Sequence, residues 1–126
     1  MPRNYHAPGL KLVGETALDG PWRARLEAVV RPVPVAEPQV YHRLIAPHVR
    51  RMNLWESEYI QVLEGENPVA DWTKSTWLAP LLAALEEPER GAFEAEYRRR
   101  VAAAYPKEPD GTTLFPFRRL FFVASL

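Results

Sequence analysis

Apolar residues recur at intervals of three and four along much of the chain, a spacing typical of helices with one buried face. The first run lies at residues 8–18, where Leu10, Val13, Ala17 and Leu18 recur at helical spacing and Gly20 is placed to end the helix. These positions predict an amphipathic helix near the amino terminus.

Prolines stand at the start of the next predicted helices, where the missing backbone N–H costs nothing. Pro21 is expected to begin a short second helix, and Pro38 a third one. In the third helix Val40, Leu44 and Ile45 are expected to form the buried stripe.

Three further helices are predicted in the second half of the chain. Asn67 followed by Pro68 supplies an N-cap and a first-turn proline, and Pro80 is expected to bend that helix or to start a new one. Pro88 begins the most regular helix of the sequence. Its apolar stripe consists of Phe93, Tyr97, Val101 and Ala104.

Two segments have the pattern of strands instead. Residues 51–63 are rich in aromatic and branched side chains and alternate at every second position. Residues 113–124 are largely apolar on both faces, which is typical of a strand inside a sheet that is covered on both sides. Because two strands alone make a weak sheet, we expect this chain to be one part of a larger fold.

The charge balance limits the classes of partner. Sixteen basic residues offset sixteen acidic ones, so no overall field attracts nucleic acid or an anionic membrane. No apolar run is long enough to span a bilayer, and the first residues lack the apolar core of a secretory signal. We therefore expect a soluble, cytoplasmic protein without a nucleic-acid or membrane partner.

The residue types that usually bind metals are scarce. Cysteine is absent, which excludes disulfides, thiolate catalysis and cysteine-based zinc sites. His6, His42 and His48 do not have the spacing of a ligand set. We expect no metal site.

Eight segments follow one another in an order that one enzyme family shares: MPRNYHAP, DGPW, YHRLIAP, NLWESEY, DWTKST, LEEPERGAF, AAAYP and DGTTLFPFRRLFFVA. With these segments the chain resembles trans-aconitate 2-methyltransferase, an S-adenosylmethionine-dependent enzyme with the Rossmann-like class I methyltransferase fold. The resemblance runs over essentially the whole sequence and overlaps only the carboxy-terminal half of the family.

The resemblance implies an α+β fold, a mostly helical cap with two long antiparallel strands that correspond to the last two strands of the methyltransferase sheet. In this single domain, residues 1–50 lead through helices into the sheet, residues 51–63 form its sixth strand and residues 113–124 its seventh. Residues 67–105 then form the helical cap over the acceptor.

The family binds S-adenosylmethionine on a glycine-rich turn after its first strand. The six glycines of this chain are scattered singly, so we expect no cofactor binding and no turnover by this chain alone. Methyl transfer to a carboxylate needs positioning rather than a general base, and we assign no catalytic residue. The family's acceptor is a small polycarboxylic acid.

Cationic and hydroxyl side chains would hold such an acceptor. Trp72, Lys74 and Thr76 occupy the cap segment of the family, where Lys74 or Thr76 would bind an acceptor carboxylate beside an aromatic wall. The alternative is that Trp72 and Leu78 belong to the core and that Lys74 is an ordinary surface charge.

Three more residues are candidates for acceptor contact. Arg119 matches an arginine of the family, and adjacent strand residues face opposite ways, so only one of Arg118 and Arg119 points into a given pocket. Asn4 follows the position of the family's fifth strand, where a turn residue is as well suited as a contact to cofactor or acceptor. The family's Gly-Leu-Arg-Pro is replaced by residues 77–80, with Trp77 for glycine and Ala79 for arginine, which puts trans-aconitate itself in doubt as the acceptor.

Two interpretations of the whole chain stay open. In the first, it is the acceptor-covering half of a methyltransferase and its partner is the amino-terminal half. In the second, it is a stand-alone, non-enzymatic module that forms a homodimer through an exposed sheet edge.

Overall fold

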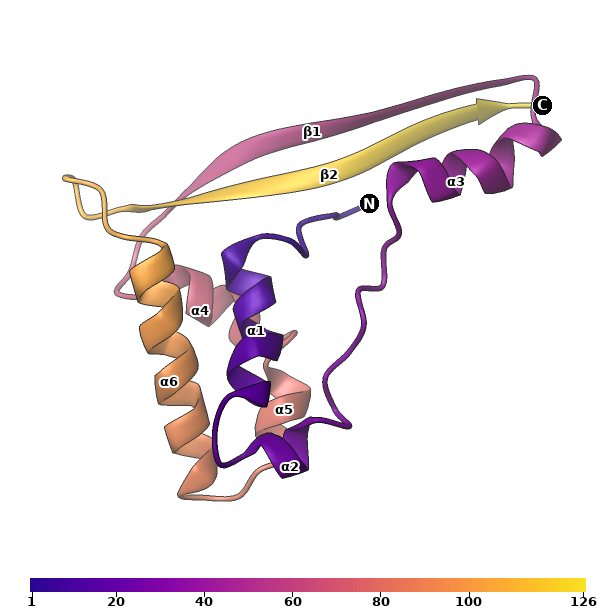
Figure 1. Cartoon of the computed structure of the whole chain (residues 1–126). Helices are drawn as coiled ribbons and strands as arrows, with labels where there is room; N and C mark the ends of the chain where they lie inside the picture. Colours follow the sequence, from indigo (N-terminus) through magenta and orange to yellow (C-terminus); the bar gives the residue numbers. More distant parts are fainter.

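The protein is built around a long β-ribbon with helices packed mainly at one of its ends. The computed structural model describes residues 1–126. Strands β1 (Arg51–Leu63) and β2 (Thr113–Ser125) pair antiparallel along their whole length, from Arg51 opposite Ser125 to Leu63 opposite Thr113 (Figure 1). This confirms an α+β fold with two long antiparallel strands.

A compact helical unit lies at the Leu63–Thr113 end of the ribbon (Figure 1). It consists of α1 (Pro8–Leu18), α2 (Arg23–Leu26), α4 (Pro68–Lys74), α5 (Ala79–Ala83) and α6 (Glu89–Ala104). Phe93, Tyr97 and Val101 of α6 are fully buried, as the periodicity predicted, and pack with Phe115 and Phe117 of β2. The core therefore joins the helices to one half of the ribbon.

Helix α3 (Pro38–Ile45), followed by a short 3₁₀ turn at Ala46–His48, lies along the other end of the ribbon. The predicted buried stripe of this helix is wrong, because the side chains of Val40 and Leu44 are 39% and 65% exposed. The helix touches the ribbon through Tyr41, whose ring stacks on Phe122, and no other element covers its outer side.

Three local expectations also need correction. Asn67 does not cap α4, because its Nδ2 donates instead to the carbonyl of Arg98, 2.8 Å away on α6. The second helix begins at Arg23, since the Trp22 side chain turns into the core and donates to the carbonyl of Thr16. On α6 the buried stripe ends at Val101, and Ala104 is exposed.

The first four residues extend the sheet on the far side of β2. Pro2 forms a bridge with Arg119, the amide of Leu120 donates to the carbonyl of Met1, and the amide of Arg3 donates to the carbonyl of Arg118. Strand β2 therefore lies between β1 and the Met1–Asn4 segment, and the outer edge of β1 has no partner strand.

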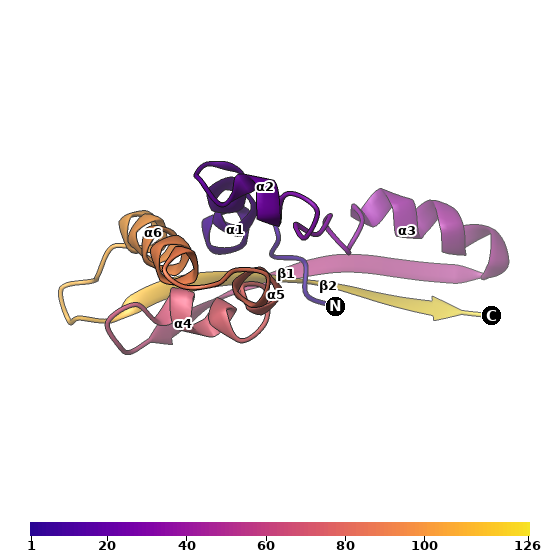
Figure 2. The same ribbon diagram turned by 90° about the horizontal axis from the view of Figure 1, so that it is seen from below.

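The two faces of the ribbon are covered differently (Figure 2). Helix α3 lies on one face, and α4 lies on the other, where Trp72 packs edge-on against Phe115 and Phe117. Beyond α4 this second face is bare. The expectation that the last strand is covered on both sides is thus wrong for its second half, because the helical unit reaches only the first half.

Candidate functional site

The three predicted residues of the cap segment are engaged in contacts within the protein. Lys74 Nζ lies 3.0 Å from Glu94 Oε2 of α6, and Thr76 Oγ1 donates to the carbonyl of Thr73 at 3.3 Å. Trp72 is partly exposed and contributes to the aromatic packing on β2. A role of these residues in acceptor binding stays a prediction.

Arg118 and Arg119 lie on opposite faces of β2, as the strand geometry requires. Arg118 is neutralised by Glu58 at 3.4 Å and by Glu56 at 3.8 Å. Arg119 has no carboxylate partner. Its Nε donates to the Tyr59 hydroxyl, and its guanidinium lies 5.2 Å from the centre of the Phe117 ring.

Asn4 is buried, with 3% of its surface exposed, and its amide pairs with the backbone of β2. Nδ2 donates to the carbonyl of Pro116 at 3.2 Å, and Oδ1 accepts from the amide of Arg118 at 3.1 Å. The residue lines a hollow of about 430 Å³ whose full charges are the acids Glu58 and Glu108. An anionic acceptor would be repelled there.

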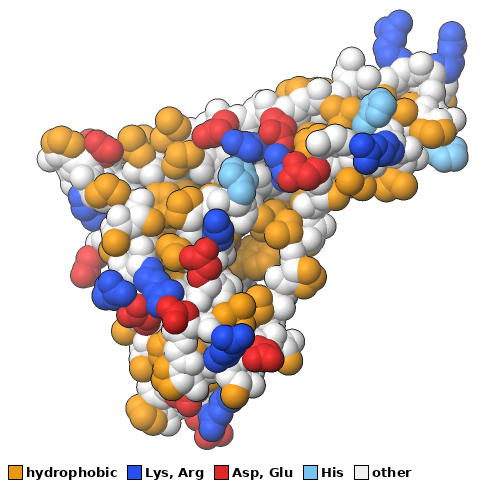
Figure 3. All heavy atoms as spheres, in the orientation of Figure 1, with side chains coloured by type: hydrophobic (Ala, Val, Ile, Leu, Met, Phe, Trp, Pro, Cys, Tyr) orange, Lys and Arg blue, Asp and Glu red, His pale blue; other side chains and the backbone are white.

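The six predicted residues are therefore not brought together in one pocket. A different place in the fold combines free positive charge with a concave apolar surface. It is a groove of about 190 Å³ between α1, the connection that follows α2, and the segment that leads into α5. Figure 3 shows hydrophobic side chains at the bottom of a hollow in the middle of this face.

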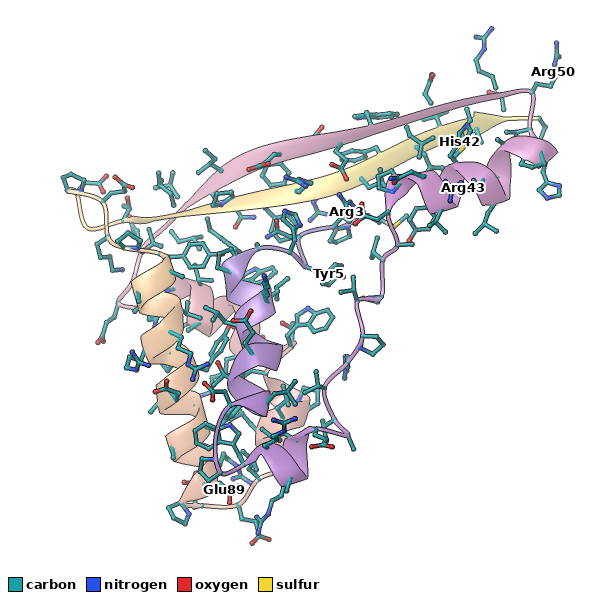
Figure 4. All side chains as sticks on the ribbon, viewed as in Figure 1. Arg3, Tyr5, His42, Arg43, Arg50 and Glu89 are labelled. Carbon is teal, nitrogen blue, oxygen red and sulfur yellow. The ribbon has the colours of Figure 1, made fainter.

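The groove is formed by segments that are far apart in the sequence. Tyr5 and Trp77 form one corner, with their ring centres 5.1 Å apart in an edge-on arrangement. Val30 and Val33 of the connection supply aliphatic walls. In Figure 4, Tyr5 lies between the first residues of the chain and the connection that leads to α3. Partial burial raises the pKa of the Tyr5 hydroxyl, so this phenol is neutral at physiological pH.

Lys11 and Arg31 are the charged residues that line this groove, and no carboxylate lines it. Lys11 has one exposed carboxylate neighbour, Glu15, at 4.0 Å, while Arg31 makes no ion pair. Residue-by-residue reasoning missed both, because a lone lysine on α1 and a lone arginine in a proline-rich connection carry no motif. The one available signal was the unusual Trp77.

An adjoining hollow shares Tyr5, Lys11 and Val33 with the groove. Its own arginine, Arg3, is neutralised by Glu37 at 3.1 Å and by Glu56 at 2.5 Å. Hydrogen bonding to Glu56 is the main cause of the raised pKa of the Arg3 guanidinium. Of the other two cations on this face, Arg31 makes no ion pair and Lys11 has only the exposed Glu15 at 4.0 Å.

The residues of this chain do not fit the cofactor that the resemblance implies. A glycine-rich turn would need several glycines in succession, but the two with positive φ, Gly65 and Gly111, stand singly in separate loops. The carbonyl of Gly65 already accepts a hydrogen bond from Lys107.

No group of three or more metal-ligating side chains is close enough to hold a metal ion. None of the helices is both long enough and apolar enough to cross a membrane.

Comparison with known proteins gives one consistent relationship. No family profile matches the chain. The trans-aconitate 2-methyltransferase of Azoarcus sp. strain BH72 is 44% identical over 124 residues, which are 98% of this chain and 48% of the relative. The enzyme of that name from Rhodopseudomonas palustris strain BisB18 is 38% identical over 125 residues, 98% of this chain and 49% of the relative.

A third relative of the same name, from Pseudomonas aeruginosa strain UCBPP-PA14, is 48% identical over 86 residues, which are 68% of this chain and 31% of the relative. The chain spans about half the length of the curated relatives that match nearly all of it. Over that half, the chain belongs to the trans-aconitate 2-methyltransferase family.

Proposed function

We propose that this chain is the acceptor-covering part of an S-adenosylmethionine-dependent methyltransferase that transfers a methyl group to a carboxylate of a small carboxylic acid. The observation that carries the proposal is that 98% of the chain matches half of an enzyme named for this reaction at 44% identity. The proposed partner of the chain is the other half of such an enzyme, which would supply the cofactor site.

The architecture supports an enzyme in which this half binds the acceptor and the other half binds the cofactor. The helical unit presents a groove with cationic and apolar lining, which suits binding and orientation of an acid. The Met1–Asn4 segment holds an extended conformation at the edge of β2, so the sheet can be extended beyond it. A carboxylate oxygen is already a nucleophile, and the chain's contribution is to position it and exclude water.

The test is complementation. This chain and the amino-terminal half of the Azoarcus relative are purified separately and mixed, and methyl ester formation from S-adenosylmethionine is measured with phenylacetate and, for comparison, with trans-aconitate. We expect no turnover and no heat of S-adenosylhomocysteine binding for this chain alone, and turnover for the mixture. Turnover by this chain alone would contradict the separation of acceptor and cofactor sites between the halves, and a tight but inactive mixture would contradict the assigned reaction.

The runner-up function is a non-enzymatic module that forms a homodimer. The unpaired outer edge of β1 and the bare aromatic face beyond α4 favour it, because both would be covered in a dimer. Two observations separate the functions. A coding region that continues in frame upstream of Met1 into a glycine-rich strand and helix supports the methyltransferase. A stable dimer that does not bind the amino-terminal half supports the module.

A further inference from the structure

We propose that the groove lined by Lys11, Arg31 and Trp77 binds a small carboxylic acid with a single apolar ring or a short branched chain, rather than a compact polycarboxylic acid. The proposal names the acceptor class of the function proposed above and rests on that function only in calling the ligand an acceptor. The binding itself is a property of this chain.

The size of the groove limits the ligand. Its volume of about 190 Å³ is below the roughly 300–1,000 Å³ of pockets that enclose drug-sized molecules. A cavity of about 150 Å³ is known to hold one benzene ring. One ring, or an aliphatic group of the same size, therefore fills the groove and leaves room for one carboxylate.

The walls select an apolar body. Trp77, Tyr5 and Val30 present ring faces, ring edges and methyl groups, and Leu81 closes the bottom. A second or third carboxylate placed against these walls would lose its hydration without gaining a hydrogen bond. This is the physical reason to exclude a tricarboxylate as the best ligand.

The charges of the groove select one carboxylate. Lys11 and Arg31 are both exposed at the groove, so their side chains can turn toward a ligand. No acid lines the groove, and the nearest carboxylate to Lys11 is the exposed Glu15 at 4.0 Å. In contrast, Glu58 and Glu108 line the hollow beside Asn4. Charge-assisted hydrogen bonds from a lysine and an arginine are the usual means of holding a single carboxylate.

The experiment uses the whole chain with phenylacetate as the probe. Phenylacetamide serves as its neutral counterpart and tricarballylate as a compact polycarboxylate. Binding is followed by ¹H–¹⁵N correlation spectra, which report the indole N–H of Trp77 and the amide of Gly14 separately from the rest of the protein. We expect saturable shifts of both signals with phenylacetate, binding at least about tenfold weaker for phenylacetamide, and no shift of these signals with tricarballylate.

Three variants and a control locate the site. Lys11→Met and Arg31→Met should each weaken phenylacetate binding about tenfold. Gly14→Leu should abolish it, because a side chain there projects toward Val30 in the groove. Arg23→Met, an exposed arginine of α2 whose ion-pair partner is Glu27, should leave binding unchanged.

Several results would overturn the proposal. The first is that phenylacetate and phenylacetamide bind equally well, and the second is that only Arg23→Met loses binding. The third is that tricarballylate shifts the Trp77 and Gly14 signals while phenylacetate does not. The fourth is that millimolar phenylacetate gives no saturable shift. All are measured without cofactor or turnover. A failed complementation experiment would therefore contradict the proposed reaction but not the binding of phenylacetate in the groove. Equally, a failure to bind phenylacetate would contradict the proposed ligand but not the proposed reaction.

Discussion

The hydroxyl groups of Thr73 and Tyr97 lie 2.8 Å apart in the centre of the helical unit, where both residues are fully buried. Tyr97 also donates to the carbonyl of Gly9 at 2.6 Å. One pair of hydroxyls thus connects α4, α6 and α1, which come from both halves of the sequence. Burial is the main reason why the pKa of Tyr97 is raised to about 12.

Removing either hydroxyl should destabilise the protein through this shared contact. We expect Tyr97→Phe and Thr73→Val each to lower the free energy of unfolding by about 0.5–1.5 kcal/mol for every buried hydrogen bond that is lost. The remaining hydroxyl keeps a backbone partner, which is the carbonyl of Ala70 for Thr73 and the carbonyl of Gly9 for Tyr97. The double variant should cost less than the sum of the two. Urea unfolding measures all three, with Tyr59→Phe on the exposed ribbon as the control. Additive effects would show that the two hydroxyls do not act together.

The same tyrosine predicts how stability depends on alkaline pH. The pKa of Tyr97 is raised in the folded state from 10.0 to about 12, so its contribution is complete below pH 10 and is lost as the pH rises toward 12. The wild-type free energy of unfolding should fall across this window, and Tyr97→Phe should reduce the slope. Urea unfolding at a series of pH values tests this. Parallel curves for the two proteins would contradict it.

Two glycines of the first helix should respond to alanine in opposite ways. At Gly9 an added Cβ would lie 2.9 Å from Cγ1 of buried Val69, so α1 and α4 would have to separate. We expect Gly9→Ala to destabilise by about 1–3 kcal/mol. At Gly14 the nearest atom would be 3.7 Å away, and Gly14→Ala should stabilise by about 0.5–1 kcal/mol through helix propensity. Thermal unfolding of both variants is compared with that of the wild type. Destabilisation by both changes would contradict the expectation that only Gly9 lacks room for a Cβ.

The two strands and the buried face of α6 could be predicted because each has a local cause. Alternation and branched side chains mark residues 51–63, and Phe93, Tyr97 and Val101 recur at helical spacing next to a starting proline. The exposure of α3 could not be predicted in this way. Its apolar residues recur at helical spacing, but the tertiary structure decides whether another element covers them.

The candidate site was harder to predict than the fold. Lys74, Arg118 and Asn4 have the chemistry of ligand-binding residues, yet each is engaged by the protein itself, by Glu94, by Glu56 and Glu58, and by the backbone of β2. Residue type reveals a charge but not its partner. Lys11 and Arg31 become conspicuous only when the folded chain places them on one groove without acids.

The contact of Lys74 leads to a prediction that separates structure from ligand binding. Lys74→Met removes a half-exposed ion pair with Glu94, which should cost less than about 1 kcal/mol of stability. If the lysine serves only to hold α4 on α6, Glu94→Gln should cost a similar amount, and neither change should affect phenylacetate binding. A loss of ligand binding in Lys74→Met but not in Glu94→Gln would instead indicate that Lys74 contacts the acceptor.

The bare face of the ribbon should make the isolated chain associate. Trp55, Tyr59, Phe121 and Val123 are all exposed there, and the rings of Trp55 and Phe121 stack at 5.5 Å. The charges on this face are Arg119 and, at the end of β1, Arg51, because Glu56 and Glu58 extend from the opposite face toward Arg3 and Arg118. A largely aromatic surface of this kind favours contact with a second copy when nothing else covers it.

Sedimentation analysis of matched variants tests this association. We expect wild type to form dimers at micromolar concentration, and Trp55→Gln combined with Val123→Lys to be monomeric. The control is Val40→Lys combined with Leu44→Lys on the outer side of α3, which is equally apolar and exposed but lies away from this face. It should remain dimeric, because exposure alone does not create a complementary surface. A control that also becomes monomeric would place the contact on α3, and a monomeric wild type would mean that the ribbon face stays open until the other half of the enzyme covers it.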